Sequence, residues 1–462
     1  FKMSRVASRR SLSQFHRLRE VSAVKHDRKP NYVSAHDALK GIESGFNIFV
    51  SGTASTPTPI LKALDEEAER RDLKGIKLHH IHLQGESPWS AKGKDRIRSN
   101  ALFIGATQGR DVNDGRVDFT PVFLTDIAQL FYRKRIPLDA AIVTVSPPDA
   151  RGYVSLGTSV DIVRSAVSMS PRLIGLVTAS QPRTLGEGVI HASQFDALVR
   201  DDHHKIYEGK AAQSSEEGTA IGRLIAENLV DNGATLQLGI GDIPNAVLAA
   251  LGGHKDLGVH TEMFADGVVD LAERGVINNR LKTTHQGKIV TSFVYGTRRL
   301  YDFVDDNPLV HFGSVEWTNN PAFIAKQRHM VAINAFVEID ITGQVCSDSI
   351  GDRFLSGFGG QLDFIYGASI GEDGRGRAIL TAPSINKKTG ESKIVTRLRP
   401  GSGVVTGRGH VHYIVTEHGI ADLWGKSVRQ RAHALIGVAH PSHRERLERE
   451  AFERLRVMPS SD

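Results

Sequence analysis

Hydrophobic and polar residues follow a regular order between residues 233 and 267. The alternation over 235–238 predicts a β-strand, and a glycine turn, Gly239-Ile240-Gly241, follows at once. Beyond the turn, one helix face is predicted by the spacing of Ile243, Val247, Leu248 and Leu251. A second short strand is predicted over 257–260. The pattern therefore predicts a strand–turn–helix–strand unit of an α/β fold.

Glu262 directly follows the second predicted strand and is the candidate chemical group of this unit. The glycine turn offers backbone N–H groups at the carboxyl edge of a parallel sheet, where open α/β sheets bind ligands. Asp242 and Asn245 can cap the helix that starts there, and Pro244 suits its first position. The pattern thus aims a carboxylate at a ring of amide donors.

Two other interpretations of the glycine turn stay open at this point. A dinucleotide site would use Glu262 to hold a ribose, but Pro244 occupies the place of the third glycine in that motif. A purely structural turn would leave Glu262 as a residue at a strand end that merely caps a helix.

The same order of elements occurs earlier in the chain. Residues 45–64 match residues 233–251 in their sequence of strand, small-residue turn and helix, and a further strand follows each stretch. This repeat indicates a duplicated α/β unit. We therefore predict two similar, open α/β domains with mostly parallel sheets, and a cleft between them that suits a substrate.

Composition and charge separate a basic leader from the rest of the chain. Residues 1–30 carry nine Lys/Arg against two acidic residues, a composition that resembles a mitochondrial transit peptide, so we expect a mitochondrial matrix protein. The remaining residues hold 49 basic and 50 acidic side chains, a net charge of −1 that indicates no nucleic-acid partner. We assign 31–212 to an N-terminal domain and 213–462 to a C-terminal domain, divided within the polar segment 207–218.

Other composition signals exclude several classes of protein. No apolar run in the 462 residues approaches the 18 that a membrane span needs, so no membrane partner is predicted. The single cysteine, Cys346, excludes an intramolecular disulfide and is expected to be buried or inert. Histidines gather at 79–82 and at 410–418, but neither group has the spacing of a metal site, so no metal is predicted.

Several longer segments together resemble the acetyl-CoA hydrolase/transferase family, the class I CoA-transferases. This family includes 4-hydroxybutyrate, butyrate and succinyl-CoA:acetate CoA-transferases. The resemblance covers about residues 33–441 and rests on FTPVFLTDIAQLF (119–131), VSPPDARGYVSLGTSVD (145–161), PRTLGEG (182–188), GIGDIPNAVL (239–248), HTEMFADG (260–267), EWTNNP (316–321), SGFGGQLDF (356–364) and VTEHGIADLWGK (415–426). So many segments in one order make the resemblance far more specific than any single glycine loop.

The resemblance implies two open, mostly parallel α/β CoA-transferase domains with the active site in the cleft between them. It places the glutamate that forms a covalent intermediate on Glu262, and the oxyanion donors on the amides of Ile243 and Gly360. Glu417 is implied as a second carboxylate that positions water or substrate. The implied coenzyme A contacts are Gly239, Ile240, Gly241, Asp242, Ile243, Ser356, Gly359, Gly360, Ser384 and Lys387.

The implied reaction moves coenzyme A between short-chain carboxylic acids, such as acetate with succinyl-CoA, butyryl-CoA or 4-hydroxybutyryl-CoA. It runs by a ping-pong mechanism through a glutamyl-CoA thioester, because a carboxylate can keep the energy of a thioester in a covalent intermediate. An acyl-CoA hydrolase that uses the same glutamate is the alternative function. An acyl-CoA and a carboxylate are expected as substrates, with no permanently bound cofactor, and the family implies a homodimer.

Overall fold

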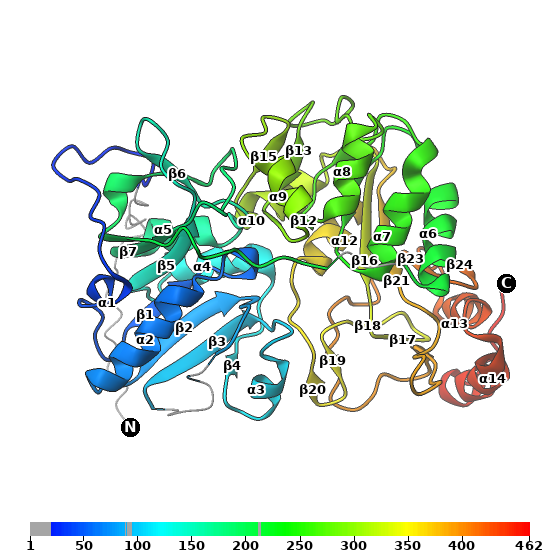
Figure 1. The fold of residues 1–462 in the computed structure, drawn as a ribbon. Coiled ribbons are helices and arrows are strands. Elements are labelled where there is room, and N and C mark those ends of the chain that lie inside the picture. Colours follow the sequence, from blue (N-terminus) through cyan, green and yellow to red (C-terminus); the bar gives the residue numbers. More distant parts are fainter. Residues whose placement is uncertain (1–19, 88, 90–94, 211–213) are drawn as a thin grey trace, which may run out of the picture.

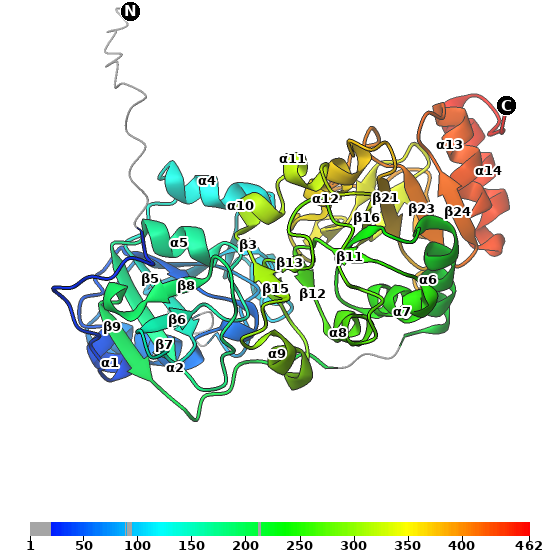
Figure 2. The same ribbon diagram turned by 90° about the horizontal axis from the view of Figure 1, so that it is seen from above.

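The computed structural model describes residues 20–87, 89, 95–210 and 214–462. The chain forms two α/β halves that lie side by side, the first from the N-terminal part of the chain and the second from the rest (Figure 1). Seen from above, the C-terminus lies at the end of the second half that is far from the first (Figure 2). The predicted class, α/β with two open and mostly parallel sheets, is confirmed by the strand pairing of each half.

Seven strands, all parallel, form the sheet of the first half. In order across the sheet they are β4 (Asp118–Phe119), β3 (Ile97–Phe103), β2 (Ile76–Ile81), β1 (Asn47–Val50), β5 (Ala140–Val145), β7 (Arg172–Val177) and β9 (Ala197–Arg200). Every residue of β5 is buried, as expected for a central strand of a parallel sheet. The helices of this half are α1 (Ala35–Ala38), α2 (Thr58–Arg70), α3 (Gly109–Asn113), α4 (Ile127–Tyr132) and α5 (Val163–Met169).

Six strands form the sheet of the second half. All neighbouring strands are parallel except the last two of the chain, which pair antiparallel at one edge. In order they are β11 (Gly258–Val259), β10 (Thr235–Leu238), β16 (Met330–Ala335), β21 (Arg377–Thr381), β23 (Tyr413–Thr416) and β24 (Gly419–Asp422). The strand predicted at 235–238 is confirmed as β10. The helices are α6 (Glu216–Leu229), α7 (Asp242–Ala250), α8 (Asp266–Glu273), α9 (Arg298–Val304), α10 (Val315–Thr318), α11 (Pro321–Ile324), α12 (Gln361–Ser369), α13 (Val428–Gly437) and α14 (Pro441–Leu455).

The two sheets repeat one arrangement of strands. In the first half, β1 lies between β2, the next strand along the chain, and the later strand β5. In the second half, β10 lies in the same way between β11 and β16. This correspondence agrees with the duplication inferred from residues 45–64 and 233–251, because β1 and β10 are the strands of those two stretches.

Close packing of α6 against α7 brings the starts of these two helices together. Ser215 caps α6 by accepting a hydrogen bond from the Gly218 amide at 3.0 Å. A Cβ on Gly222 would lie 2.6 Å from the carbonyl carbon of Ala246 in α7, so only glycine permits this separation of the helices. The first turn of α7, which contains Asp242 and Ile243 of the predicted ligand loop, is therefore fixed against the start of α6.

Short strands and loops join the two halves. β12 (Met263–Phe264) pairs with β14 (Phe293–Val294), and β13 (Ile289–Thr291) pairs with β15 (Val310–Phe312). From the first half, the Thr158 carbonyl accepts from the Val294 amide at 2.9 Å, and the Asp161 amide donates to the Ser292 carbonyl at 3.1 Å. The two contacts involve Ser292 and Val294, which flank Phe293, and the Phe293 amide donates to the Glu262 carbonyl at 3.2 Å.

The predicted leader extends into the packed part of the first half. Residues 1–19 lie outside the described residues. Val21, however, is fully buried in the core, and Arg28 forms an ion pair with Asp196 at 2.7 Å. Residues 20–30, assigned to the leader by composition, therefore contribute to the packing of this half. Among the described residues, no helix has the length and hydrophobicity of a membrane-spanning segment.

Candidate active site

The backbone of Glu262 is fixed where the two halves meet. Its carbonyl oxygen accepts three hydrogen bonds, from the amides of Ser292 (2.9 Å) and Phe293 (3.2 Å) and from the Thr291 hydroxyl (3.1 Å). The preceding Thr261 hydroxyl donates to the carbonyl of Leu238, at the end of β10, at 3.1 Å. Glu262 therefore leaves β11 at the carboxyl edge of the second sheet, as the strand pattern predicted.

A buried lysine supports the strand that leads to Glu262. The Lys282 amine donates to the carbonyl oxygens of Val259 and Lys288, each at 2.7 Å. A Cβ on Gly258 would lie 2.6 Å from Lys282 Cγ, so the glycine leaves room for the lysine side chain. Burial lowers the pKa of Lys282 to about 7, because the charged ammonium is poorly solvated there.

Two donors face the Glu262 carboxylate. Asn319 Nδ2 donates to Glu262 Oε2 at 2.8 Å, and the Gly360 amide also donates to this carboxylate. A Cβ on Gly360 would lie 1.9 Å from Oε2, so a side chain at position 360 would collide with the carboxylate. Gly360 is the N-cap of α12, and a carboxylate beside the start of a helix also gains from the helix dipole.

Burial and neighbouring charge perturb the acidity of Glu262. Burial raises its pKa to about 7, and the negative charge of Asp161 adds to this rise. Hydrogen bonds from Asn319 and Gly360 act in the opposite direction, since they stabilise the ionised form. Glu262 is therefore a carboxylate of unusually high basicity, and it titrates near neutral pH.

Two further buried carboxyl groups lie around Glu262, one from each half. Burial raises the pKa of Asp161 to about 6, although Ser159 and the Ile162 and Val163 amides donate to its carboxylate. Burial also raises the pKa of Asp363 well above its usual value, and Asn319 Nδ2 donates to Asp363 Oδ2 at 3.3 Å. Asn319 thus bridges Asp363 and Glu262.

Asn319, Asp161 and Asp363 received no individual role from the sequence. Each lies inside a segment that supports the family resemblance, namely 316–321, 145–161 and 356–364. Their presence in those segments was the available signal, because the three residues are far apart along the chain and converge only in the fold.

A cavity of about 230 Å³ opens beside Glu262, and several of the predicted site residues line it. Its lining includes Glu262 and the predicted coenzyme A contacts Gly239, Ser356, Gly359 and Gly360. Phe103, at the end of β3, adds a wall from the first half. The cavity therefore lies between the halves, with the candidate nucleophile exposed to it.

The other residues of the predicted glycine loop face different surroundings. Ile240 and Gly241 line a cavity of about 690 Å³ beside α8, and Gly241 has a φ of 116°, which favours glycine. Ile243 is buried in the first turn of α7, and none of the hydrogen bonds found among the described residues joins its amide to Glu262. Among the described residues, the Ile243 amide therefore makes no hydrogen bond that would confirm it as an oxyanion donor.

The expected capping of α7 is wrong in its details. The N-cap residue of α7 is Gly241, which makes no side-chain capping hydrogen bond, and the helix begins at Asp242, so Pro244 is its third residue. The Asp242 carboxylate instead accepts from the amide and hydroxyl of Ser215, at 2.7 and 2.5 Å. Because α6 and α7 start side by side, Asp242 binds the neighbouring helix start.

A third cavity, of about 450 Å³, adjoins the 230 Å³ cavity beside Glu262 and is lined by several cations. Lys387 and Asp242 line it, and Leu355 lines it next to Ser356 of the first cavity. The Lys387 amine pairs with Glu217 at 2.5 Å. Lys393 is a further cation of this cavity, and burial lowers the pKa of its amine.

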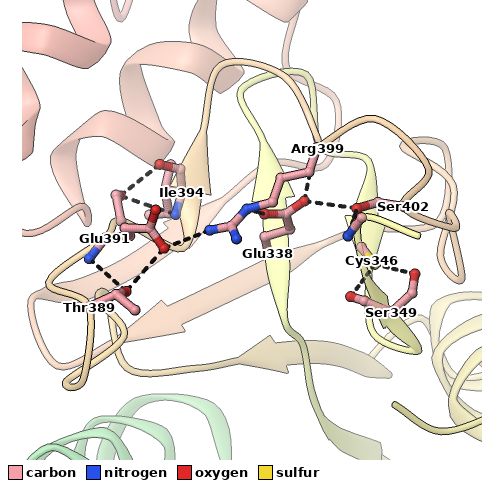
Figure 3. A network of polar contacts seen from close by, with 10 residues as sticks. Glu338, Cys346, Ser349, Thr389, Glu391, Ile394, Arg399 and Ser402 are labelled. Atoms are coloured by element: carbon pink, nitrogen blue, oxygen red, sulfur yellow. Dashed lines mark hydrogen bonds and ion pairs between the residues drawn. The ribbon is translucent and has the colours of Figure 1, made fainter. Parts of the chain in front are cut away.

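Arg399 also lines this 450 Å³ cavity. Figure 3 shows its contacts with the neighbouring carboxylates. Its guanidinium lies between Glu338, at 3.4 Å, and Glu391, at 2.9 Å. Cys346 lies near this network, and its thiol donates to the Ser349 carbonyl at 3.2 Å. Burial raises the pKa of this thiol, which agrees with the expectation of a buried cysteine.

Glu417 and Ser384 form a separate cluster. The Glu417 carboxylate accepts from the Ser384 amide at 2.8 Å and from its hydroxyl at 2.5 Å. Ser384 is fully buried. The structure thus places these two predicted residues together. Within the described residues, no three His, Cys, Asp or Glu side chains are arranged to hold a metal ion.

The fold and the site define a class of protein: a two-domain α/β enzyme with a basic, half-buried carboxylate facing backbone and amide donors at the junction. The chain belongs to the acetyl-CoA hydrolase/transferase family. The model of the family's N-terminal domain matches residues 19–207, and that of its C-terminal domain matches residues 296–451. The enzyme is therefore a CoA-transferase.

Individual relatives agree with this assignment. The chain is 49% identical over 434 residues to a succinyl-CoA:acetate/propanoyl-CoA:succinate CoA transferase of Fasciola hepatica, covering 94% of this chain and 90% of the relative. It is 42% identical to a 4-hydroxybutyrate coenzyme A transferase of Clostridium kluyveri, covering 92% and 98%. Among solved structures, it resembles a 4-hydroxybutyrate CoA-transferase from Porphyromonas gingivalis with a TM-score of 0.77 and 36% identity, covering 92% and 98%.

Proposed function

We propose that the protein transfers coenzyme A from a short-chain acyl-CoA to a carboxylic acid through a glutamyl-CoA thioester on Glu262. The observation that carries this proposal is the Glu262 carboxylate, held at 2.8 Å by Asn319 and contacted by the Gly360 amide inside the cavity between the halves. The substrates of the relatives support acetate, succinyl-CoA and 4-hydroxybutyryl-CoA as candidate substrates.

The first half-reaction consists of two substitutions at carbonyl carbons. The Glu262 carboxylate attacks the acyl carbonyl of the donor, the C–S bond breaks, and coenzyme A leaves as a thiolate from a mixed anhydride. The thiolate then attacks the glutamyl carbonyl, the anhydride C–O bond breaks, and the donor acid leaves as a carboxylate. An acceptor carboxylate reverses both steps and takes the coenzyme A away.

The surroundings of Glu262 suit this chemistry in two respects. In the second substitution, the negative charge develops on an oxygen of Glu262 itself, where Asn319 and Gly360 donate; loss of one such donor costs about 2.7–4 kcal/mol in comparable sites. The anhydride and the thioester are also neutral. Burial, which disfavours the Glu262 carboxylate, therefore favours its conversion to either intermediate.

Mass spectrometry of the peptide that contains Glu262 tests the proposal. Wild-type protein mixed with an acyl-CoA should carry a coenzyme A adduct on this residue, and borohydride should reduce the thioester only when the acyl-CoA is present. The Glu262→Ala and Glu262→Gln variants should show neither adduct nor exchange. Exchange at the wild-type rate in either variant would refute the mechanism.

The release of free coenzyme A distinguishes transfer from hydrolysis. A transferase should release little free coenzyme A without an acceptor acid, and acetate should turn over the glutamyl thioester to acetyl-CoA. Release that is fast without acetate and unchanged by it would instead indicate the acyl-CoA hydrolase alternative.

A further inference from the structure

The peptide group between Gly359 and Gly360 is contacted on both of its edges. Its N–H, which belongs to Gly360, donates to the Glu262 carboxylate. Its carbonyl, which belongs to Gly359, accepts a hydrogen bond at 3.0 Å from the Leu124 amide. Since the N–H and C=O of a trans peptide point in opposite directions, Leu124 lies on the far side of this group from Glu262.

Leu124 belongs to the first half of the molecule, whereas Glu262 and Gly360 belong to the second. Its neighbour Phe123 pairs with Gly359 in a parallel bridge, and the Phe123 ring packs on Phe358 with ring centres 5.1 Å apart. The segment 123–125 therefore docks on the glycine loop through a single β-bridge at Phe123, and the 3₁₀ helix Leu124–Asp126 starts directly after it.

The same segment also contacts the support of the second donor. The Thr125 amide donates to Asp363 Oδ2 at 3.4 Å, and this oxygen accepts from Asn319 as well. Residues 123–125 thus stand behind both groups that donate to Glu262, although none of the three carries a reactive side chain.

The Gly359–Gly360 peptide needs such support because its own residues do little to fix it. Gly359 has a φ of 57° and Gly360 lacks a side chain, so the chain can rotate this peptide plane at low steric cost. A rotated peptide would aim its carbonyl oxygen at the Glu262 carboxylate and remove the donor. A hydrogen bond to the Gly359 carbonyl opposes that rotation, and in a chain of hydrogen bonds it also strengthens the N–H on the other edge.

We propose that the backbone of residues 123–125 is a positioning element for catalysis, in which the Leu124 amide holds and polarises the Gly359–Gly360 peptide that stabilises the oxyanion. This inference rests on the proposed function of Glu262. It assigns a role to the segment FTPVFLTDIAQLF, for which the sequence indicated no chemistry. It also makes the catalytic power of the second half depend on docking of the first.

Replacement of one amide by an ester tests the proposal with little change in shape. Leucic acid, the α-hydroxy analogue of leucine, introduced at position 124 removes the N–H and keeps the side chain. A matched control places the α-hydroxy analogue of isoleucine at Ile127, whose amide donates to the Leu124 carbonyl within the same segment.

The ester at position 124 should slow formation of the glutamyl-CoA thioester and lower kcat by at least about tenfold, less than the 10²–10³-fold loss of a whole donor. KM for the acyl-CoA should change by less than about threefold, because the donor acts mainly on the transition state. The acid limb of the pH–rate profile should also move to higher pH, since weaker donation raises the pKa of Glu262. The other carboxyl groups that face Glu262, Asp161 and Asp363, are unchanged in all variants.

The ester at position 127 should keep thioester formation within about threefold of the wild-type rate under conditions where thermal melts show all proteins folded. An unchanged rate with the ester at position 124, or an equal loss with the ester at position 127, would overturn the positioning role. Both outcomes leave the proposed function intact as long as wild-type protein forms the Glu262 adduct. Absence of that adduct in wild type would refute the function itself.

Discussion

Asn319 is the side chain on which the acidity of Glu262 can be tested most directly. It is fully buried, and its Nδ2 donates to Glu262 Oε2 at 2.8 Å and to Asp363 Oδ2 at 3.3 Å. Asn319→Asp exchanges this NH₂ group for an oxygen with almost no change in volume. The variant loses the donor and places a third carboxyl group between two that are already buried.

The size of the effect follows from the lost hydrogen bond. A hydrogen bond to a charged group contributes about 1.5–3 kcal/mol, which corresponds to roughly 1–2 pKa units. The pKa of Glu262, about 7 in the wild type, should therefore rise further. The nucleophile must be ionised, so its active fraction at pH 7 falls. Loss of an oxyanion donor adds a factor of about 10²–10³ in rate.

Initial rates of coenzyme A exchange measured from pH 6 to 10 test this reasoning. The Asn319→Asp variant should be at least about 10²-fold slower at pH 7, and part of the loss should be recovered at high pH as Glu262 ionises. Asn320→Asp is the matched control, because Asn320 only caps α11 through the Ala322 amide, and aspartate caps equally well. An Asn319→Asp profile that overlays the wild type, or an equal loss in Asn320→Asp, would refute the reasoning.

Three further changes have directions that the structure fixes. Gly360→Ala should reduce thioester formation by at least about 10²-fold in a rapid-quench assay, because the new Cβ would lie 1.9 Å from Glu262 Oε2. The pKa of Lys282 is about 7 in the native state and near its ordinary value of 10.5 in the unfolded state. Between these two pH values the unfolded state therefore binds more protons than the native state. Native stability therefore rises with pH across this window by up to about 1.4 kcal/mol per unit, and urea titrations should show that Lys282→Met lacks this rise. Glu417→Gln weakens the hydrogen bonds from Ser384, so exchange should slow while mass spectrometry still finds the Glu262 adduct.

Features of the site that depend only on residues close together along the chain were predictable from the sequence. The strand at 235–238 and the position of Glu262 after the next strand follow from short apolar patterns, and the fold places both as expected. The pairing of Asp242 was not predictable. Its carboxylate has two helix starts within reach, and only the packing of α6 on α7 decides that it binds Ser215.

Asn319 illustrates why the rest of the site could not be predicted from the sequence. It stands beside Asn320 in the segment EWTNNP, and nothing local distinguishes the two asparagines. In the fold, Asn319 is turned inward between two carboxyl groups, and Asn320 caps a short helix. The difference arises because α10 ends at Thr318, whose carbonyl oxygen lies 2.8 Å from Nε2 of the buried His260, and that contact involves residues 58 positions apart.

These contacts show that the two halves contribute different groups to the site. The second half supplies Glu262, the proposed nucleophile, together with Asn319 and the Gly360 amide, which contact its carboxylate. The first half supplies the Asp161 charge, the Phe103 wall and the amides of Leu124 and Thr125. Burial is also the largest cause of the raised pKa of Glu262. Loosening the docking of the first half would therefore solvate Glu262, lower its pKa and weaken its donors together, so nucleophilicity and oxyanion stabilisation should be lost as one unit.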